Sequence, residues 1–365
     1  MSTLSDRYII NKKTLDKKTA LIKIYLVKKI KVPVEKSVGL ALAHDITYIN
    51  KEEGFKGARF KKGHVISQSD VDILKSIGKS YIYKLIPNKD DIHEDDFAIE
   101  IAPYIAGKNV FYDKSPSEGK INFYSAINGL LKIDKNKLFK INAISDLSLP
   151  CIHNNFACNE NKTIAAFRII PLYTNKKVLE KSKKILETPI FNVIAYSVKT
   201  INAIITGNEI YYGLRKDLFK SHIESKLKKY GYTINDYKIV PDNAKAISEA
   251  LNQLKTADLV FVCGGSSVDP DDVTKQSLSK AKVKFVFKSN PIQPANNLSI
   301  GYLENSTICV VPAGSLYYKA SALDIFLPRL LAKDHIDKKE LKFYSEGGLC
   351  HFCDYCTYPI CPFGK

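Results

Sequence analysis

The sequence contains little arginine, and this scarcity argues against a nucleic-acid partner. The formal net charge is +17, but only five of the 55 basic residues are arginine. Recognition of phosphates and base edges favours the bidentate arginine fork. The lysines are spread along the chain among many asparagines and isoleucines. We therefore expect no nucleic acid among the partners.

Long apolar runs are also lacking, which excludes a predicted membrane span. The longest charge-free stretch, residues 289–303, contains two prolines and three asparagines and falls short of the ~20 apolar residues that a span needs. The N-terminal 32 residues have lysines scattered among apolar residues and no small-residue cleavage site, unlike a secretory signal. We expect a soluble, cytoplasmic protein whose eight cysteines are reduced.

The second half of the chain alternates between short apolar runs and helical patterns. Runs typical of buried strands occur at 201–205, 259–263, 283–287 and 307–311. Helices are predicted by Phe219, Ile223 and Leu227, by the stripe of Ala244, Ile247, Leu251 and Leu254, and over 317–332. Strands separated by single helices predict a doubly wound α/β domain with a mostly parallel sheet.

Three unusual loops follow predicted strands, at 206–210 (TGNEI), 264–272 (GGSSVDPDD) and 312–315 (PAGS). Ligands of such sheets bind beyond the carboxyl ends of the strands. In the second loop the glycines let the backbone approach a phosphate, the serines add hydroxyl donors, and the aspartates could hold Mg²⁺. A tight loop before a helix N-cap would have the same composition, so this structural alternative stays open. Neither GxGxxG nor a P-loop occurs.

These loops resemble the molybdopterin-binding domain shared by the molybdopterin molybdenumtransferase and gephyrin-type proteins. TGNEI, VPDN (240–243), GGSSVDPDD and LPRLLA (327–332) keep the order and spacing of that family over residues 190–333. The resemblance implies that Glu209, Asp242 and Asp272 are the catalytic acids around pterin phosphate, nucleotide and Mg²⁺. It implies cofactor-binding roles for Thr206, Gly207, Glu209, Gly264, Gly265, Ser266, Ser267, Pro312, Ala313 and Gly314.

The sequence departs from the family pattern in ways that leave two functions open. Asp269 and Val310 stand where the family has glycine, and the small β-rich terminal domain of the full transferases is missing. In the first function, the protein is an enzyme that inserts molybdate into adenylylated molybdopterin. In the second, it carries molybdopterin or the finished cofactor to a molybdenum enzyme. The resemblance also implies a homo-oligomer.

The first 170 residues resemble the transferase N-terminal region more weakly, at 33–48 and at 57–85, where a turn and a short helix (70–77) are expected. The stretch CIHNNF (151–156) is similar to shorter molybdopterin-binding proteins, and its His153 is a candidate for ligand contact or for a loop hydrogen bond. We predict an N-terminal mixed α/β region (1–173), a linker (174–189), the molybdopterin-binding domain (190–335) and a Cys-rich tail (336–365).

The tail carries half of the cysteines of the chain. Cys350, Cys353, Cys356 and Cys361 form C-x₂-C-x₂-C-x₄-C-P. Four thiolates at this spacing can close round one Zn²⁺ or anchor a 4Fe–4S cluster, although the bacterial cluster run is one residue shorter in its last gap. We predict a metal centre here; the alternative is four unliganded thiols in a terminal peptide.

Overall fold

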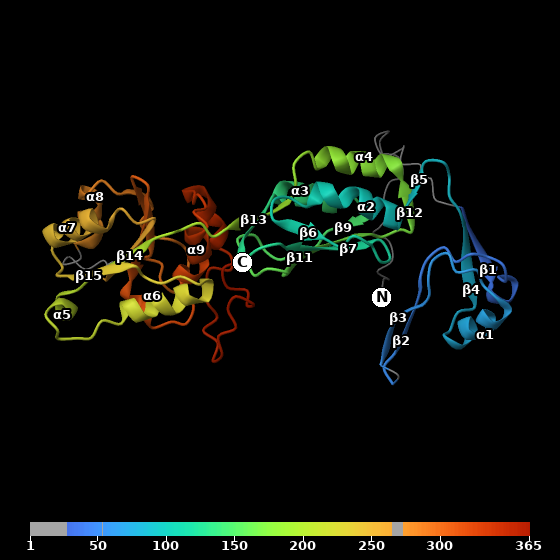
Figure 1. Ribbon diagram of the computed structural model, residues 1–365, viewed down its shortest axis with the longest axis horizontal. Coiled ribbons are helices and arrows are strands. Elements are labelled where there is room, and N and C mark those ends of the chain that lie inside the picture. The colour runs from blue at the N-terminus through green and yellow to red at the C-terminus, as the bar shows by residue number, and fades with distance from the viewer. Residues whose placement is uncertain (1–27, 53, 265–272) are drawn as a thin grey trace, which may run out of the picture.

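The computed structural model describes residues 28–52, 54–264 and 273–365. Figure 1 shows three regions in a row: a small N-terminal region, a middle domain, and a C-terminal α/β domain with the tail beside helix α9 (Ala322–Leu331). None of the helices in the described ranges is long and apolar enough to cross a membrane.

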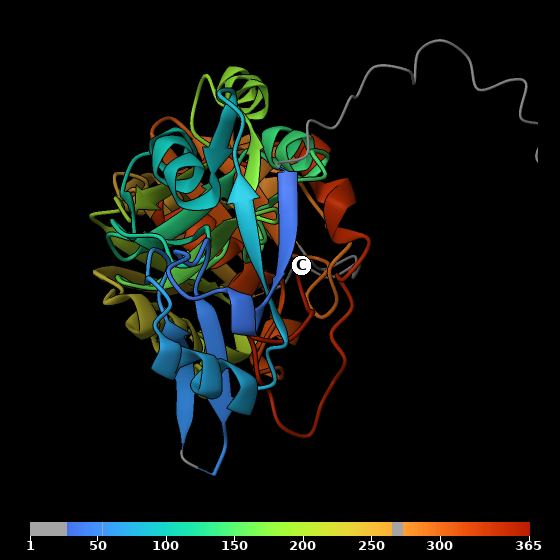
Figure 2. The same cartoon turned by 90° about the vertical axis from the view of Figure 1, so that its right-hand side faces the viewer.

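The N-terminal region consists of two antiparallel strand pairs and one helix, and it faces the viewer in Figure 2. Its elements are β1 (Lys28–Pro33), β2 (Ile46–Asn50), β3 (Phe55–Phe60), α1 (Gln68–Ser76) and β4 (Tyr81–Ile86). Strand β1 pairs with β4, and β2 pairs with β3. Helix α1 starts at a capping box between Ser67 and Asp70, and its Val71 and Leu74 are buried in the core of this region. The expected short helix is therefore present.

The middle domain combines small antiparallel sheets with three helices. Its strands are β5 (Asp91–His93), β6 (Val110–Tyr112), β7 (Lys120–Ser125), β8 (Gly129–Ile133), β9 (Leu147–Ser148), β10 (Ala157–Cys158), β11 (Thr163–Ile169), β12 (Tyr173–Asn175) and β13 (Phe191–Ala195). Its helices are α2 (Glu94–Ile105), α3 (Lys135–Asn142) and α4 (Lys176–Ile185). The fully buried Phe97 of α2 stacks on Phe167 of β11, with ring centroids 6.0 Å apart, so the helix packs directly on the sheet.

The segment that we expected to be a linker, 174–189, is packed and not free in solvent. Asn175 caps α4, whose Leu179 is buried in the core of the middle domain together with Leu186. Strand β13 follows and pairs with β8 of the same domain. From its many lysines we expected this helix to be surrounded by solvent. That expectation is wrong for one face of the helix, because its few apolar residues are spaced to reach the core. The boundaries of the domains themselves stay a prediction.

The C-terminal domain is built on a sheet of order β15-β14-β16-β19-β18-β17. Its strands are β14 (Ile201–Thr206), β15 (Asp236–Val240), β16 (Leu259–Gly264), β17 (Lys284–Phe287), β18 (Ser299–Leu303) and β19 (Ser306–Pro312). Besides α9, its helices are α5 (Asn208–Tyr211), α6 (Phe219–Leu227), α7 (Ala244–Leu254) and α8 (Thr274–Lys280). Strands β15, β14, β16 and β19 are parallel neighbours, whereas β18 runs antiparallel between β19 and β17.

Side chains of the central strands alternate between two separate cores. In β16, Phe261 and Cys263 belong to the core shared with α6 and α9, whereas Val260 and Val262 belong to the core shared with α7 and α8. Both faces of the sheet are therefore covered, which is why these strands are continuous apolar runs. The predicted fold class, a doubly wound and mostly parallel α/β domain, is confirmed.

The last predicted helix is shorter than expected. Residues 317–321 are not helical, and α9 begins after Ser321, whose backbone N–H donates to the Asp324 carboxylate at 2.8 Å. The backbone N–H of Ala322 donates to the carbonyl of Pro294, a residue distant in sequence. The start of α9 is thus set by a capping box and by a tertiary contact, neither of which the apolar periodicity of 317–332 contains.

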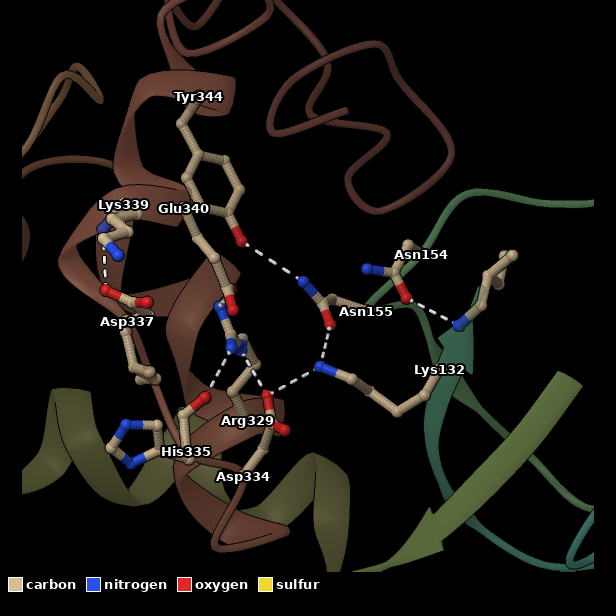
Figure 3. Close-up of polar contacts among 12 residues, drawn as sticks. Lys132, Asn154, Asn155, Arg329, Asp334, His335, Asp337, Lys339, Glu340 and Tyr344 are labelled. Carbon is tan, nitrogen blue, oxygen red and sulfur yellow. Dashed lines mark hydrogen bonds and ion pairs between the residues drawn. The ribbon is translucent and has the colours of Figure 1, made fainter. Parts of the chain in front are cut away.

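The middle and C-terminal domains are joined by a polar cluster around Arg329 (Figure 3). Lys132 of β8 donates to Asp334 at 2.9 Å and to Asn155 at 3.0 Å. Asp334 in turn accepts from Arg329 Nε at 2.6 Å. The side-chain amide of Asn155 reaches the Tyr344 hydroxyl at 3.5 Å. One carboxylate therefore links cations from both domains.

Glu94, the first residue of α2, is a buried carboxyl, with 7% of its surface exposed. Burial, reinforced by the charge of Asp95, raises its pKa from 4.5 to about 7. The folded state then binds this proton more tightly than the unfolded chain does. Stability contributed by Glu94 is consequently present at low pH and is lost as the pH rises from about 4.5 through 7.

We expect Glu94→Gln to remove this pH dependence. Relative to the variant, the wild-type protein should lose about 2–3 kcal/mol of unfolding free energy between pH 5 and pH 8. Urea unfolding at several pH values measures the difference, with Glu187→Gln, a change at an exposed carboxylate, as the control. If the unfolding free energies of the wild type and Glu94→Gln changed with pH in the same way, the raised pKa of Glu94 would be contradicted.

Candidate functional site

The three loops singled out from the sequence leave one edge of the parallel sheet. Thr206 pairs with Val240 at the ends of β14 and β15, and Gly264 pairs with Pro312 at the ends of β16 and β19. Ile205 lies opposite Cys263, so β14 and β16 end side by side. The edge thus collects the carboxyl ends of four adjacent strands, where ligands of doubly wound sheets bind.

The first loop begins with a buried hydroxyl and a glycine turn. Thr206 is 2% exposed, and its Oγ1 has no hydrogen-bond partner among the described residues. Gly207 has φ 149°, which turns the chain sharply into α5. Glu209 follows on α5 as an exposed side chain. The loop therefore presents a buried donor at its base and a carboxylate at its rim.

Asp242 is held against the first loop by two reciprocal hydrogen bonds. Its carboxylate accepts from the backbone N–H of Asn208 at 3.3 Å, and its own N–H donates to the Asn208 side chain at 3.1 Å. Asn243, the next residue, caps α7 through the N–H of Ala246. Two of the predicted acids, Glu209 and Asp242, are thus brought to the same end of the sheet.

The second loop starts at Gly264, where the structure leaves no room for a side chain. A Cβ placed there would lie 2.3 Å from Thr206 Oγ1 and 2.4 Å from the Thr206 carbonyl oxygen. Close backbone approach between β14 and β16 thus accounts for this glycine. The predicted residues Gly265, Ser266, Ser267 and Asp272 lie outside the described residues. Their phosphate and Mg²⁺ roles stay predictions.

The third loop contributes a residue that the sequence analysis did not single out. Pro312 ends β19, and Ala313 and Gly314 are exposed at the start of a 3₁₀ helix (Ala313–Leu316). Ser315, in the same helix, is fully buried, and its Oγ has no hydrogen-bond partner within the described ranges. The only sequence signal for it was its place in the PAGS loop.

The site therefore contains two buried hydroxyls that have no hydrogen-bond partner among the described residues, Thr206 and Ser315. A buried hydroxyl without a partner costs about 1–3 kcal/mol, so such groups usually have one. Phosphate oxygens accept hydrogen bonds from hydroxyls. The chemistry of the described residues thus fits a phosphate group at this edge.

His153 lines a different cavity, together with Tyr230 and Asp324, and none of the described loop residues of the sheet edge lines that cavity. Its Nδ1 is 3.0 Å from the carbonyl oxygen of Asn154, which only accepts, so Nδ1 carries the proton. Burial lowers the pKa of the imidazole and keeps it neutral. Its Nε2 has no partner among the described residues, and the ring packs edge-on against Phe156. The contacts of His153 are those of a residue that makes a hydrogen bond within its loop. A ligand role for His153 stays a prediction.

The four tail cysteines lie round one cavity of about 510 Å³. Cys353 and Cys356 are exposed, whereas Cys350 and Cys361 are half-buried. In the part of the chain that the structure describes, no three His, Cys, Asp or Glu side chains are close enough together to hold a metal ion. The structure thus places the thiols on one cavity without gathering them round one point.

Comparison with known proteins matches two parts of the chain. Residues 202–332 match a family described as a probable molybdopterin binding domain, and residues 31–85 match a domain of unknown function. A CinA-like protein of Fervidobacterium nodosum is 28% identical over 120 residues, which are 32% of this chain and 29% of that protein. A CinA-like protein of Citrifermentans bemidjiense is 37% identical over 76 residues, 20% of this chain and 18% of that protein.

Among solved structures, the molybdopterin biosynthesis Mog protein of Mycobacterium ulcerans is similar at 18% identity and a TM-score of 0.31, over 38% of this chain and 99% of that chain. The chain spans less than a third of the length of the two CinA-like relatives. The sheet edge with its three loops falls inside the matched range. Residues 202–332 of this chain therefore belong to the family of probable molybdopterin binding domains.

Proposed function

We propose that the C-terminal α/β domain binds the phosphate of molybdopterin, or of its adenylylated form, and that the protein acts in molybdenum cofactor biosynthesis. The observation that supports this proposal is the sheet edge of a domain in this family, with the buried hydroxyls of Thr206 and Ser315 beside the Gly264 turn. The described groups bind and orient an anion. Asp242, fixed by Asn208, supplies a carboxylate next to it.

For turnover we propose Mg²⁺ held by Asp242 and Asp272, with Glu209 at the rim. Bound Mg²⁺ would neutralise phosphate charge while molybdate is inserted into adenylylated molybdopterin and AMP is released by water. The second candidate is a carrier that binds the pterin without this reaction and passes it to a molybdenum enzyme. Release of AMP that depends on both molybdate and protein distinguishes the two. An unchanged adenylylated pterin after stoichiometric binding would support the carrier.

We infer a metal-binding role for the tail as well. Zn²⁺ and a 4Fe–4S cluster are the two candidates that the C-x₂-C-x₂-C-x₄-C spacing allows. All four cysteines are free thiols, and they face the same cavity. These two observations support the role.

The Mg²⁺ assignment predicts unequal effects of two neighbouring substitutions. Asp272→Asn should weaken Mg²⁺-dependent pterin binding by on the order of tenfold, because Mg²⁺ has few protein ligands and each matters. Asp271→Asn should change the affinity by less than about twofold, because only Asp272 falls on the final acid of the family pattern. Titration of the purified protein with molybdopterin, with and without Mg²⁺, measures both.

The titration without Mg²⁺ is the control, since there both variants should bind like the wild-type protein. Equal losses for Asp271→Asn and Asp272→Asn would contradict the metal role of Asp272. Absence of pterin binding by the wild-type protein in either condition would overturn the proposed function.

A further inference from the structure

The cavity at the tail has one wall made of cysteines and another made of residues that follow the third loop of the pterin site. Cys350, Cys353, Cys356 and Cys361 line it together with Tyr317, Tyr318, Lys319 and Ala320. Aromatic side chains, among them Phe352 and Tyr358, complete its lining. The cavity is thus lined by four cysteine sulfurs and by several aromatic rings.

The tail loop is anchored at both ends but has no core of its own. Gln293 exchanges two backbone hydrogen bonds with the tail, to Gly348 and from Cys350, each 2.8 Å long. At the other end, the Tyr358 hydroxyl donates to the Asp324 carbonyl at 3.0 Å, and Phe363 is buried. Between the anchors the chain has neither helix nor strand, and Phe352, Tyr355 and Ile360 are 55%, 86% and 84% exposed. A metal centre would supply the cross-links that this segment lacks.

One sulfur already accepts a backbone hydrogen bond. The N–H of Phe352 points at Cys350 Sγ over 3.5 Å. Phe352 reaches this position with φ 53°, a left-handed conformation that is uncommon for a bulky residue. Hydrogen bonds to sulfur stabilise a thiolate ligand and tune iron–sulfur centres. The backbone conformation of the first Cys-x-x-Cys turn therefore directs an N–H group at the Cys350 sulfur.

The size of the space favours a cluster over a single ion. Zinc sits about 2.3 Å from each of four sulfurs, so its thiolates must nearly touch. The described thiols are not gathered in this way but stand round a cavity of about 510 Å³. A 4Fe–4S cube, held from outside by four cysteines, occupies such a space.

We propose that Cys350, Cys353, Cys356 and Cys361 bind a 4Fe–4S cluster in this cavity, and that the cluster is coupled to the pterin site through residues 312–320. The 3₁₀ helix of the third loop runs directly into Tyr317–Ala320 on the cavity wall. The Tyr318 ring contacts that of Phe352, with centroids 5.7 Å apart. Occupying the cavity would fix this wall and, through it, the position of Ser315. The coupling, unlike the cluster, rests on the proposed function.

Anaerobic reconstitution of the full chain with Fe³⁺, sulfide and excess dithiothreitol tests the cluster, with Zn²⁺ in a parallel sample. The dithiothreitol supplies the two electrons per cluster that convert four Fe³⁺ into two Fe³⁺ and two Fe²⁺. We expect about four irons per chain and a brown absorption band. Cys353→Ser should lower bound iron at least about tenfold, since a ligand at an exposed position is lost without disturbing the core. Cys151→Ser, which removes a thiol outside the cavity, should bind as much iron as the wild-type protein. One equivalent of zinc without colour, or equal iron in both variants, would overturn the proposal.

Pterin titration of the reconstituted and metal-free protein tests the coupling. We expect affinities that differ by about fivefold or more, the usual lower range of coupling between sites. Identical affinities would overturn the coupling and leave the cluster standing. Failure of both samples to bind pterin would instead overturn the proposed function, while iron content and colour still report on the cluster. Thermal unfolding of Cys353→Ser, followed by circular dichroism, checks that this variant folds.

Discussion

Replacing Arg329 by methionine is expected to lower the free energy of unfolding by about 3 kcal/mol, because it leaves the largely buried Asp334 carboxylate, whose side chain is 10% exposed, without its closest cation. The Arg329 side chain is fully buried (Figure 3). Its Nε donates to Asp334 at 2.6 Å, its Nη2 donates to the His335 carbonyl at 3.0 Å, and its Nη1 lies 2.7 Å from the Glu340 carboxylate. Lys132 would still neutralise part of the charge on Asp334, so we place the loss at the lower end of the range for broken buried pairs.

Lys333→Met is the matched control for Arg329→Met. Lys333 also contacts a carboxylate, Asp258 at 2.6 Å, but its side chain is 43% exposed. Exposed pairs contribute about 1 kcal/mol or less, so this variant should unfold nearly like the wild-type protein. The chain contains no tryptophan, and urea unfolding is best followed by circular dichroism. Equal losses of unfolding free energy in the two variants would show that burial does not determine how much the Arg329 ion pairs contribute to stability.

Gly264→Ala is expected to cost about 3 kcal/mol and to displace the edge on which the candidate site is built. The new Cβ would meet the backbone of Thr206 at 2.4 Å, and the backbone at Gly264 has φ 134°, which side-chain-bearing residues rarely adopt. Overpacking of this kind costs about 1–3 kcal/mol, and a strained backbone adds to that cost. Strands β14 and β16 must move apart, so pterin binding should weaken together with stability.

Gly314→Ala controls for the loss of a loop glycine in the stability measurement alone, because Gly314 is itself a predicted cofactor-binding residue. A Cβ at Gly314 meets nothing within 4 Å, and φ there is not positive, so the change should be neutral or stabilise by up to about 1 kcal/mol. Thermal unfolding of both variants and pterin titration of Gly264→Ala provide the measurements. A Gly264→Ala protein with wild-type stability and affinity would mean that β14 and β16 are not held as closely as the structure shows.

The sequence by itself determined the elements whose signal is local. Runs such as LVFVC (259–263) are apolar at every position, because β16 is covered on both faces, and this predicted a buried parallel strand. Helix α7 was predicted from its apolar stripe, and in the structure Asn243 caps it. The three strands that carry the loops, and hence the edge where the loops meet, followed from these elements and the switch-point rule.

Elements that depend on distant partners could not be predicted in this way. Strand β18 contains Ser299 and Gly301, which carry little strand signal, and it exists because it is paired on both sides by β17 and β19. By sequence, helix α4 is a lysine-rich segment typical of a solvated helix. Only the structure shows that its Leu179 is buried in the core of the middle domain. For both, the stabilising partner lies far along the chain.

The candidate site likewise has some features that the sequence indicated and others that only the structure showed. The residue types at Thr206, Glu209, Asp242 and the tail cysteines were chemical signals in the sequence. Only the tertiary structure decided that, among the residues it describes, the Thr206 and Ser315 hydroxyls are buried without partners and the tail thiols surround a cavity and do not meet at a point. Burial and convergence result from packing between segments, and no local pattern of residues carries that information.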